Sequence, residues 1–331
     1  MMMKPVNWGV LGVSGHFIKR IWLPARDSSL AQVVAIASRS GSRSKEAAER
    51  YGIEKGYGSY EELLADKSIE AVYMPLPNHI HLEWIKKAAD AGKHILCEKP
   101  LCLNAAQTEQ AIEYAQKKGV LLMEAFMYRF HPQWRRVDDL IRSNEIGAVH
   151  SVQCFFSYNN ANPKDIRNQV ETGGGGLLDI GCYAVSSARF AMGREPDRVV
   201  SLVQRDSRFN TDVLASAMMD FGGAHAIFTV STQMFGDQRV EVHGTGGSIA
   251  VHLPFNVFPD VPVRVTVTNG VGARDIFTGP VDMYGLQLDA FSWAVRNKEA
   301  APTPPSDALA NMKVLDAIFR SEKSSAWEKV Q

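Results

Sequence analysis

The first 125 residues alternate short, continuously apolar segments with helical segments, and this alternation constrains the fold more than any other feature of the chain. Strands of this kind are typical of a parallel sheet that helices cover on both faces. We therefore expect an α/β fold here. The expected strands are 6–11, 33–38, 71–75, 94–97 and 121–125, and the expected helices are 44–51, 60–65, 79–91 and 105–118.

The pattern changes after a helix that we expect at residues 132–144. The segments that follow are polar at alternate positions, which is typical of a mostly antiparallel sheet with one face exposed or covered by another subunit. Gly222-Gly223 and the run Gly-Thr-Gly-Gly at 244–247 are predicted to be turns between strands. The expected strands are 150–158, 199–204, 214–221, 225–231, 239–243, 247–252 and 263–268, and the expected helices are 177–192, 284–297 and 306–321.

These patterns predict two domains and a C-terminal segment. Residues 1–126 are expected to form a Rossmann dinucleotide-binding domain. Residues 127–300 are expected to form an α+β domain with a large, mostly antiparallel open sheet, which binds substrate and mediates oligomerisation. Residues 301–331 are expected to form a C-terminal helix that packs back on the first domain.

Composition excludes several classes of function. The chain has 36 Lys and Arg against 36 Asp and Glu, and nucleic-acid or anionic-membrane binding needs a basic excess. No apolar run approaches the ~20 residues of a membrane span, and residues 1–7 show no apolar secretion signal, so we expect a cytoplasmic protein. The four cysteines include no C-x-x-C pair and the histidines show no ligand spacing, so we expect reduced thiols and no metal.

A glycine-containing turn follows the first expected strand. Gly12, Ser14 and Gly15 stand where such a turn brings the backbone close to a pyrophosphate, and His16 and Phe17 would begin the helix whose free N–H groups face it. Ser14 replaces the usual second glycine, and Phe17 replaces the usual small third residue. On this motif alone, a plain strand–helix turn is an equally good interpretation.

The end of the second strand bears on the choice of cofactor. Ser38 and Arg39 stand where NAD-specific sites place a carboxylate, and a hydroxyl beside a guanidinium suits a 2′-phosphate instead. Arg43 adds a second cation. The sequence therefore favours NADP over NAD, which remains a possible cofactor; the alternative is that both arginines are surface residues of a polar loop.

A lysine follows the fourth strand, in Glu98-Lys99-Pro100. Ligands of open parallel sheets bind beyond the carboxyl ends of the strands, so we expect Lys99 to point toward a nicotinamide. Its ammonium could hydrogen-bond a substrate oxygen and stabilise negative charge on it. The proline requires an extended or turn backbone before it. The alternative is a surface lysine at a strand end.

This motif and the upstream run Pro75-Leu76-Pro77-Asn78-His79-Ile80-His81 resemble the Gfo/Idh/MocA oxidoreductase family, over roughly residues 6–320. The runs at 124–132 and 173–183 resemble the branch that holds NADP-dependent D-xylose dehydrogenases and dimeric dihydrodiol dehydrogenases. The resemblance implies a Rossmann domain followed by a domain with an open sheet, and a homodimer or homotetramer that forms through that sheet. It also implies that Lys99 is catalytic.

Asp179 and Tyr183 are four residues apart on an expected helix and therefore project from one face. The glycine run 173–176 before them would let the backbone approach a ligand. The resemblance implies that Tyr183 is the acid/base, and a phenol with a pKa near ~10 needs help from a neighbour such as the Lys99 ammonium. Asp179 would bind a sugar hydroxyl or orient Lys99. The alternative is a core tyrosine and a first-turn carboxylate favoured by the helix dipole.

Further residues are expected near the ligands. Aromatic faces and amide groups suit sugar rings, which have apolar C–H faces and many hydroxyls. An interdomain ion pair is an equally good interpretation of Arg129, and core packing is the alternative for Tyr284. The remaining cofactor candidates are Pro75, Leu76, Asn78, His81, Glu98 and Arg129, and the remaining substrate candidates are Phe155, Tyr158, Asn160, Arg167 and Tyr284.

The sequence thus predicts an NADP-preferring dehydrogenase or reductase that moves a hydride between nicotinamide C4 and a sugar, polyol or dihydrodiol carbon. Oxidation of an aldose at C1 is the first expectation for the substrate. Dihydrodiol oxidation and reduction of a 1,5-anhydrofructose-type ketose remain as alternatives. A catalytically silent sugar or dinucleotide sensor with the same fold is the alternative from another class.

Overall fold

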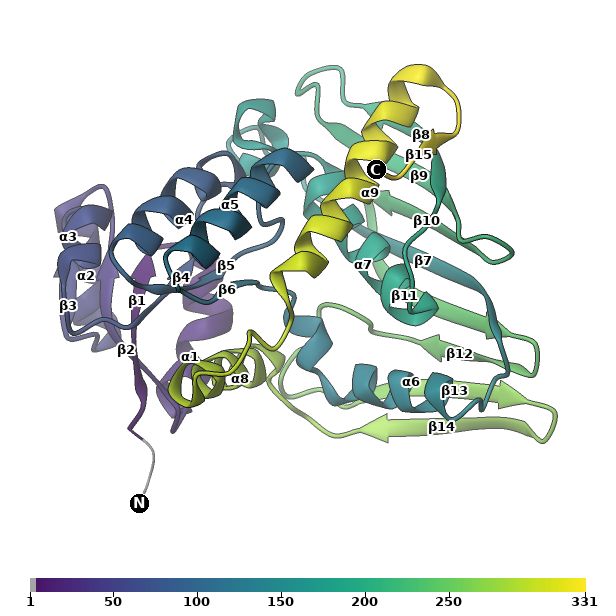
Figure 1. Ribbon diagram of the computed structural model, residues 1–331, viewed down its shortest axis with the longest axis horizontal. Coiled ribbons are helices and arrows are strands. Elements are labelled where there is room, and N and C mark those ends of the chain that lie inside the picture. Colours follow the sequence, from purple (N-terminus) through teal and green to yellow (C-terminus); the bar gives the residue numbers. More distant parts are fainter. Residues whose placement is uncertain (1–3) are drawn as a thin grey trace. The chain divides into compact units, whose positions relative to one another are not determined.

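The computed structural model describes residues 4–331, which divide into two compact units (Figure 1). The first unit contains the residues up to Phe126 together with Tyr284–Leu309. The second unit contains Met127–Met283 together with Ala310–Gln331. Each unit therefore combines a long segment with a shorter one from near the end of the chain.

The first unit is built on a six-stranded parallel sheet with the order β3-β2-β1-β4-β5-β6. The order reverses between β1 and β4, and dinucleotides bind beyond the carboxyl ends of strands at such a switch point. The expected parallel sheet is confirmed, with β3 as an unexpected edge strand because its Lys-Gly-Tyr sequence has no apolar run. The strands are β1 (Val6–Leu11), β2 (Ala31–Ala37), β3 (Lys55–Tyr57), β4 (Ala71–Met74), β5 (His94–Cys97) and β6 (Leu122–Glu124).

Local signals set the ends of the helices around this sheet. Ser59 Oγ accepts a hydrogen bond from Glu62 N at 3.1 Å, and Asn104 Oδ1 accepts one from Gln107 N at 2.9 Å, so both residues are N-caps. Gly52 ends a helix with a φ of +67°, which glycine adopts without strain. The helices are α1 (Trp22–Asp27), α2 (Gly41–Tyr51), α3 (Tyr60–Ala65), α4 (His81–Asp90), α5 (Ala105–Lys117) and α8 (Met283–Asn297).

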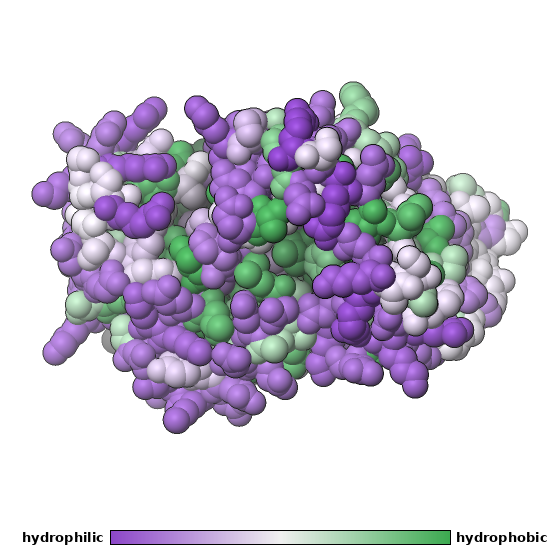
Figure 2. Space-filling view, turned by 90° about the horizontal axis from the view of Figure 1, so that it is seen from above, coloured by the Kyte–Doolittle hydropathy of each residue, from purple (hydrophilic) through white to green (hydrophobic). Residues whose placement is uncertain are grey.

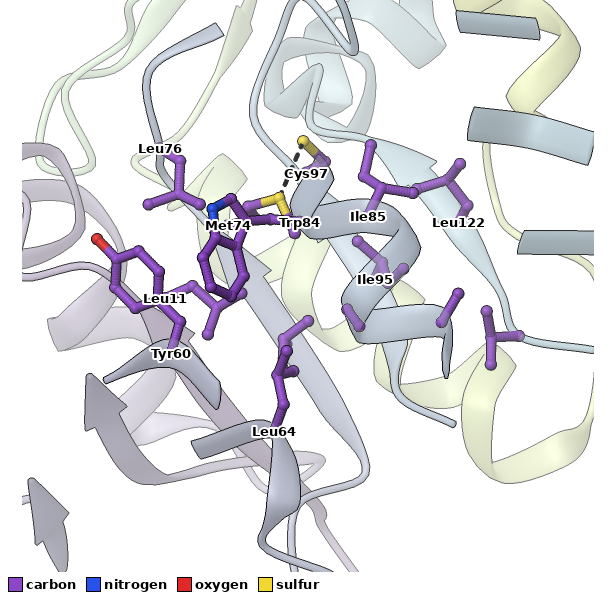
Figure 3. Close-up of a cluster of buried hydrophobic side chains, with 14 of the residues drawn as sticks. Leu11, Tyr60, Leu64, Met74, Leu76, Trp84, Ile85, Ile95, Cys97 and Leu122 are labelled. Carbon is purple, nitrogen blue, oxygen red and sulfur yellow. Dashed lines mark hydrogen bonds between the residues drawn. The ribbon is translucent and has the colours of Figure 1, made fainter. Parts of the chain in front are cut away.

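Apolar side chains from strands and helices form the core on one face of this sheet (Figure 3). Leu11 and Ile95 come from strands and are buried against the helical residues Trp84 and Ile85. Burying a side chain of this size contributes roughly 1.5–3 kcal/mol. This core fixes the carboxyl ends of β1, β4 and β5 relative to one another, and those ends carry most of the candidate cofactor residues.

The second unit is built on a nine-stranded sheet with the order β14-β13-β12-β11-β7-β10-β9-β8-β15. Its neighbours are antiparallel except for β7 and β10, so the expected mostly antiparallel sheet is confirmed. β14 and β15 were not expected. The strands are β7 (Val149–Asn159), β8 (Arg198–Arg205), β9 (Asp212–Asp220), β10 (His225–Ser231), β11 (Gln233–Gly244), β12 (Gly247–Val251), β13 (Val263–Asn269), β14 (Gly272–Thr278) and β15 (Glu328–Lys329).

Helices α6 (Pro132–Arg142), α7 (Cys182–Met192) and α9 (Pro305–Ser324) complete the fold. Gly222 and Gly223 turn the chain between β9 and β10, where Phe221 N donates to Ala224 O at 2.9 Å, so the predicted hairpin is confirmed. Figure 1 shows α7 lying along β7. The turn at 244–247 likewise joins the antiparallel strands β11 and β12.

The C-terminal part of the chain divides differently from the expected domain boundaries. Residues 284–300 were expected in the second domain, yet α8 packs in the first unit, where Trp8 Nε1 donates to Ser292 Oγ at 3.0 Å and Arg296 pairs with Glu70 at 2.6 Å. Residues 301–331 were expected on the first domain. Residues 301–309 do belong to the first unit, whose core contains Ala308, whereas Ala310–Gln331 belong to the second unit, where β15 pairs with β8. Contacts across long sequence separations set these placements, and local patterns do not contain them.

Hydrophilic side chains cover most of the surface that Figure 2 shows, with apolar side chains in separate patches between them. Within residues 4–331, no helix is long and apolar enough to cross a membrane.

Candidate active site

The glycine turn after β1 has the backbone of a dinucleotide-binding turn. Gly12 is buried, has a φ of +118° and donates its N–H to Ala37 O at 3.0 Å, so a side chain there would be strained. Ser14 Oγ accepts a hydrogen bond from Phe17 N at 3.0 Å. Gly15 is exposed, with no atom within 4 Å of the place where a Cβ would stand. The pyrophosphate contacts of Gly12, Ser14 and Gly15 stay predictions, and the turn leaves space for them.

Phe17 could face a cofactor only through its backbone, and this contact stays a prediction. Its side chain is fully buried, with its ring 6.2 Å from that of Tyr73 on β4. It begins a π-helical turn, Phe17–Ile21, which leads into α1. The position where related turns carry a small residue is therefore occupied here by a core aromatic.

Glu98 and His16 link the end of β5 to the glycine turn. Glu98 Oε1 accepts a hydrogen bond from Tyr73 Oη at 2.6 Å and lies 3.4 Å from His16 Nε2, an electrostatic contact rather than an aligned hydrogen bond. Burial alone would raise the pKa of Glu98, but His16, the Tyr73 hydroxyl and the Lys99 charge outweigh it and hold that pKa at about 2. Glu98 is therefore ionised at neutral pH. Sequence reasoning missed Tyr73 because it reads as an ordinary strand residue.

His81 fixes the loop that carries Lys99. Its ring is fully buried, with Nε2 2.8 Å from Leu76 O and Nδ1 3.1 Å from Pro100 O. Burial lowers the pKa of His81 although these carbonyl groups favour its protonated form. The expected contact of the His81 side chain with a cofactor is wrong, since no surface is left for one. The ring instead ties the ends of β4 and β5 together beside Lys99, whose bond to Pro100 is cis.

The adenosine end of the expected site carries two exposed arginines, Arg39 and Arg43. Arg43 Nη2 donates to Val13 O at 2.7 Å and so holds α2 to the glycine turn. Ser38 is nearly buried, and its Oγ accepts from Ser40 N at 3.3 Å. Burial raises the pKa of Tyr60, and the charges of Arg39 and Arg43 partly offset that rise. Tyr60 was missed because an aromatic residue on a helix reads as core.

Pro75, Leu76 and Asn78 follow β4 at the same edge of the sheet. Leu76 is buried, while Pro75 and Asn78 are half-buried. Their cofactor contacts stay predictions. Tyr284, at the start of α8, lies in the first unit with its ring edge-on to His16 at 5.6 Å, and its expected substrate contact stays a prediction.

The glycine run 173–176 packs closely against other residues of the second unit. A Cβ on Gly174 would lie 2.5 Å from Arg167 O, and one on Gly175 would lie 2.0 Å from Asp212 Oδ1. Gly175 also has a φ of +123°. The expectation that this run admits a ligand is therefore replaced by close packing against the chain's own loop and a buried carboxylate.

Asp179 and Tyr183 follow this run. The expected single helix is divided into a π-helical turn, Leu177–Gly181, and α7, so Asp179 lies in the turn and Tyr183 in the helix. Such turns are often found at functional sites. Asp179 Oδ2 accepts hydrogen bonds from Tyr158 Oη at 2.6 Å and from Arg167 Nε at 3.1 Å. The structure thus brings three expected substrate residues together.

Tyr183 is 5% exposed and is held by aromatic neighbours in the second unit. Its ring lies 5.2 Å from that of Phe255 and 5.8 Å from that of Phe156, and its hydroxyl donates to Met127 Sδ at 3.4 Å. A thioether is a weak acceptor. Packing among these aromatic rings therefore fixes the Tyr183 ring within the second unit.

Phe155 was expected to contact substrate, and this expectation is wrong. Successive strand residues face opposite sides, and Phe156 and Tyr158 are the β7 residues that face Tyr183 and Asp179. Phe155 lies on the other face, in a hollow of about 620 Å³ that Leu202 and Met218 also line. The expectation named Phe155, whereas the neighbouring Phe156 is the aromatic residue that faces Tyr183.

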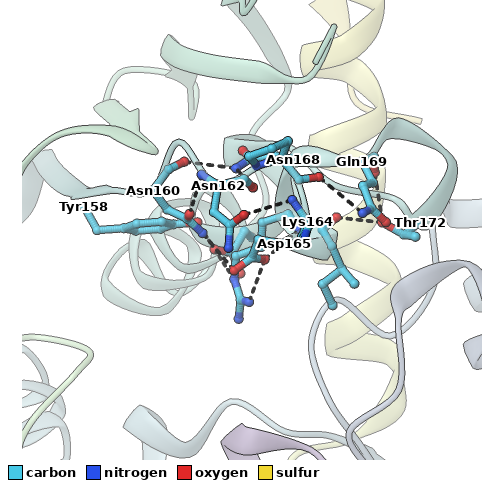
Figure 4. A network of polar contacts seen from close by, with 12 residues as sticks. Tyr158, Asn160, Asn162, Lys164, Asp165, Asn168, Gln169 and Thr172 are labelled. Carbon is cyan, nitrogen blue, oxygen red and sulfur yellow. Dashed lines mark hydrogen bonds and ion pairs between the residues drawn. The ribbon is translucent and has the colours of Figure 1, made fainter. Parts of the chain in front are cut away.

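Arg129 and Asn160 both lie in the second unit. Arg129 Nη2 donates to Ser186 Oγ on α7 at 2.9 Å, and its expected cofactor contact stays a prediction. Asn160 Nδ2 donates to Asp165 Oδ2 at 2.8 Å, in a loop of polar contacts that includes Asn162 and Asn168 (Figure 4). Within residues 4–331, no group of three or more His, Cys, Asp or Glu residues is placed to hold a metal ion.

Asp212 is a buried carboxylate beneath the π turn. Oδ2 accepts a hydrogen bond from Leu177 N at 2.5 Å, and burial raises the pKa of Asp212 to about 6 against partly offsetting contributions from Leu177 N and Arg205. Because this pKa lies above the ordinary 3.8, the contribution of Asp212 to stability is fully present below about pH 4 and is lost as pH rises through 6.

We therefore expect Asp212→Asn to raise the melting temperature at pH 8 and to leave it nearly unchanged at pH 4. The amide oxygen still accepts from Leu177 N, while the cost of a buried charge, at most about 3 kcal/mol, disappears. Thermal unfolding followed by circular dichroism between pH 4 and pH 8 measures the difference. A variant less stable than the wild type at pH 8 would show that the charged form holds the turn.

Comparison with known proteins addresses both units. The family model for the oxidoreductase family with an NAD-binding Rossmann fold matches residues 6–126, and the model for the GFO/IDH/MocA C-terminal domain matches residues 134–250. The chain belongs to the Gfo/Idh/MocA oxidoreductase family. An uncharacterised oxidoreductase from Rhizobium meliloti is 41% identical over 99% of this chain and 100% of its own length.

Two further relatives have more informative names. A D-xylose 1-dehydrogenase (NADP(+)) from Haloferax volcanii is 39% identical over 96% of this chain and 98% of its own length. A 3-ketoreductase from Actinomadura kijaniata, solved in complex with NADP and TDP-benzene, has a TM-score of 0.90 at 31% identity, covering 96% of this chain and 98% of that one. The resemblance inferred from the motifs is thus confirmed over nearly the whole chain.

Proposed function

We propose that this oxidoreductase uses NADP to transfer a hydride to or from a hydroxyl-bearing carbon of a sugar, with oxidation of an aldose at C1 as the first candidate reaction. The observation that carries the proposal is the position of Lys99 directly after β5, in a loop that His81 fixes from β4, next to the switch point of the parallel sheet. Ligands bind at this edge of such sheets. The xylose dehydrogenase among the relatives supports the choice of substrate class.

The chain's own residues supply the proton chemistry in this proposal. When bound, NADP(H) supplies or accepts the hydride at nicotinamide C4. Lys99 donates a hydrogen bond to the substrate oxygen and stabilises negative charge on it, and Tyr183 removes the hydroxyl proton during oxidation and returns it during reduction. The ketoreductase relative has been solved with a lysine replaced by alanine or glutamate and with a tyrosine replaced by phenylalanine, the two residue types assigned here.

The first unit fits a dinucleotide with a 2′-phosphate. The turn is open at Gly15, where a Cβ would have no atom within 4 Å, and no carboxylate stands at Ser38 or Arg39, where NAD-specific sites place one. Arg39 and Arg43 supply two exposed guanidinium groups, and Arg43 Nη2 donates to Val13 O of the glycine turn. Because guanidinium groups pair with phosphate, this chemistry favours NADP, with NAD as the weaker cofactor.

We expect Arg39→Ala to raise the KM for NADP at least ~10-fold and to change the KM for NAD less than about twofold, since only NADP carries the charge that Arg39 pairs with. Initial-rate measurements with both cofactors at one fixed aldose concentration give the two ratios. Arg26→Ala, which removes an exposed arginine of the same unit that pairs with Asp27, is the control. Equal losses for NADP and NAD would remove the 2′-phosphate argument.

The activity is tested by mixing the purified protein with NADP and a panel of aldoses, polyols and dihydrodiols and following NADPH by its absorbance at 340 nm. NADPH formation with an aldose supports the first candidate, and formation only with a dihydrodiol selects that alternative. Oxidation of NADPH with a ketose would select the reductase alternative. Saturable binding of NADP without turnover of any panel member would contradict the proposal and indicate a sensor.

We also propose that the second unit associates through the outer face of its sheet, as a homodimer or homotetramer. Leu202 is 79% exposed there, and Met218 and Ile227 are about 40% exposed around the same hollow. Exposed apolar faces of this kind are typical of protein–protein contacts. Sedimentation equilibrium should give a mass two or four times the 36.5 kDa of the chain, and a monomer would contradict this assembly. The expected cytoplasmic location stays a prediction.

A further inference from the structure

Arg167 stands beside Asp179, the carboxylate that we expect to bind substrate. Its side chain is 41% exposed, and Nε lies 3.1 Å from Asp179 Oδ2. An unpaired arginine in this position would attract sugars with a carboxylate or phosphate group, since its forked donors match those anions. The guanidinium is not unpaired, however, because Nη1 lies 3.4 Å from Asp165 Oδ1. Two carboxylates therefore share this one cation.

The loop around Asp165 holds this carboxylate in place (Figure 4). Asp165 Oδ1 accepts a hydrogen bond from Arg167 N at 3.0 Å, and Oδ2 accepts one from Asn160 Nδ2 at 2.8 Å. Asn168 Nδ2 donates to Asn160 O at 3.0 Å and to Asn162 O at 2.9 Å, which closes the loop on itself. Asp165 is therefore a fixed partner of Arg167 rather than a surface acid that can swing away from it.

The other carboxylate is equally fixed. Tyr158 Oη donates to Asp179 Oδ2 at 2.6 Å, the same oxygen that Arg167 contacts. Burial and the charge of Asp179 raise the pKa of Tyr158, so its phenol stays a donor, and the charge of Asp179 raises the pKa of Arg167, so its guanidinium stays charged. Tyr158 and Arg167 therefore both remain donors to Asp179.

We propose that Asp165 is a specificity-determining residue which, by neutralising Arg167, makes the subsite beside Asp179 select uncharged sugars and reject anionic ones. This inference rests on the proposed function, in which Asp179 lines the substrate site. An anion entering here finds the Arg167 guanidinium already paired with Asp165 and Asp179, so it loses hydration without gaining that cation as a partner. Withholding a partner from the wrong substrate supplies specificity that attraction of the right one cannot supply alone.

The test compares D-glucose with D-glucuronate, which differ in charge at one carbon. With NADP and the full-length wild type, kcat/KM for glucuronate is expected to lie at least ~10²-fold below that for glucose. Asp165→Asn removes one of the two carboxylates that pair with Arg167. It should reduce the glucose-to-glucuronate ratio of kcat/KM at least ~10-fold, mainly through a lower KM for glucuronate. Asp275→Asn is the matched control. It removes the same charge from the edge strand β14, where Asp275 pairs with Arg264 of β13, and it should leave the glucose-to-glucuronate ratio of kcat/KM unchanged.

Two further measurements keep the inference falsifiable. If Asp165→Asn disturbs the loop and abolishes turnover, calorimetric binding of glucuronate to the NADPH complex gives the same comparison, and the variant must bind at least ~5-fold more tightly than the wild type. Asp165→Glu keeps the charge and should keep the discrimination. Equal binding of glucuronate to wild type and Asp165→Asn would overturn the inference.

The inference and the proposed function fail in different ways. Wild-type protein that oxidises glucose and glucuronate with similar kcat/KM contradicts the role of Asp165 alone. Wild-type protein that oxidises no sugar contradicts the proposed function as well.

Discussion

Lys99→Met is expected to lower kcat at least ~10²-fold while changing the dissociation constant for NADP less than about threefold. Methionine keeps much of the aliphatic length of lysine but removes the ammonium, so the substrate oxygen loses the group that stabilises its charge. The backbone of the loop does not depend on that side chain, because His81 contacts the Pro100 and Leu101 carbonyl groups and Leu101 N donates to Glu124 Oε1 at 2.7 Å. Stopped-flow absorbance at 340 nm measures the rate, and quenching of tryptophan fluorescence measures cofactor binding.

The control for this variant is Lys86→Met, which removes a lysine of α4 whose ammonium lies 3.5 Å from Gln110 Oε1. It should retain wild-type kcat. A Lys99→Met protein with full turnover would show that the ammonium at the end of β5 takes no part in the chemistry.

Tyr183→Phe is expected to lower kcat for aldose oxidation at least ~10²-fold, because no side chain then removes the hydroxyl proton. The substitution keeps the ring, whose contacts with Phe156 and Phe255 hold it in place, and it removes the hydroxyl that donates to Met127 Sδ. The melting temperature should therefore change little. Steady-state rates between pH 6 and pH 10, together with thermal unfolding, separate the catalytic effect from a structural one.

Tyr128→Phe is the matched control for Tyr183→Phe. The Tyr128 ring lies 5.8 Å from that of Tyr183, and its hydroxyl bonds Ser186 Oγ at 2.7 Å. Losing this buried hydrogen bond should cost about 1 kcal/mol of stability with a small effect on kcat. Similar kcat values for the two variants would mean that Tyr183 is only a packing residue.

Much of the first unit can be predicted from its sequence, because strands buried on both faces leave continuous apolar runs. The segments 6–11 and 94–97 have in the structure the bounds that their apolar runs predict. The Lys-Gly-Tyr strand β3 could not be predicted in this way, since it is short, polar and at an edge. The place of α8 in the first unit depends on contacts such as Trp8 to Ser292, which join residues far apart in the chain.

The candidate site was predicted less completely than the fold. Motifs identified Lys99, Asp179 and Tyr183, and hydrogen bonds bring Tyr158 and Arg167 to Asp179. The choice of Phe155 failed because Phe155 and Phe156 are alike in sequence and only the pleat of β7 decides which of them faces Tyr183.

The roles of His81 and Asp212 could not be predicted either. Their importance lies in what they contact: backbone carbonyl groups for His81, and a backbone N–H beneath the glycine run for Asp212. A sequence shows the residue type at such positions but not its partners.

A crystal structure of the protein with NADPH and a bound aldose is the most direct test of the central claim. The account predicts that Lys99 Nζ and Tyr183 Oη both lie within about 3.2 Å of one substrate oxygen, with the carbon that bears it facing nicotinamide C4. A complex in which either side chain lies beyond hydrogen-bonding reach of that oxygen, with no water between them, would contradict the assignment of these two residues to the proton chemistry.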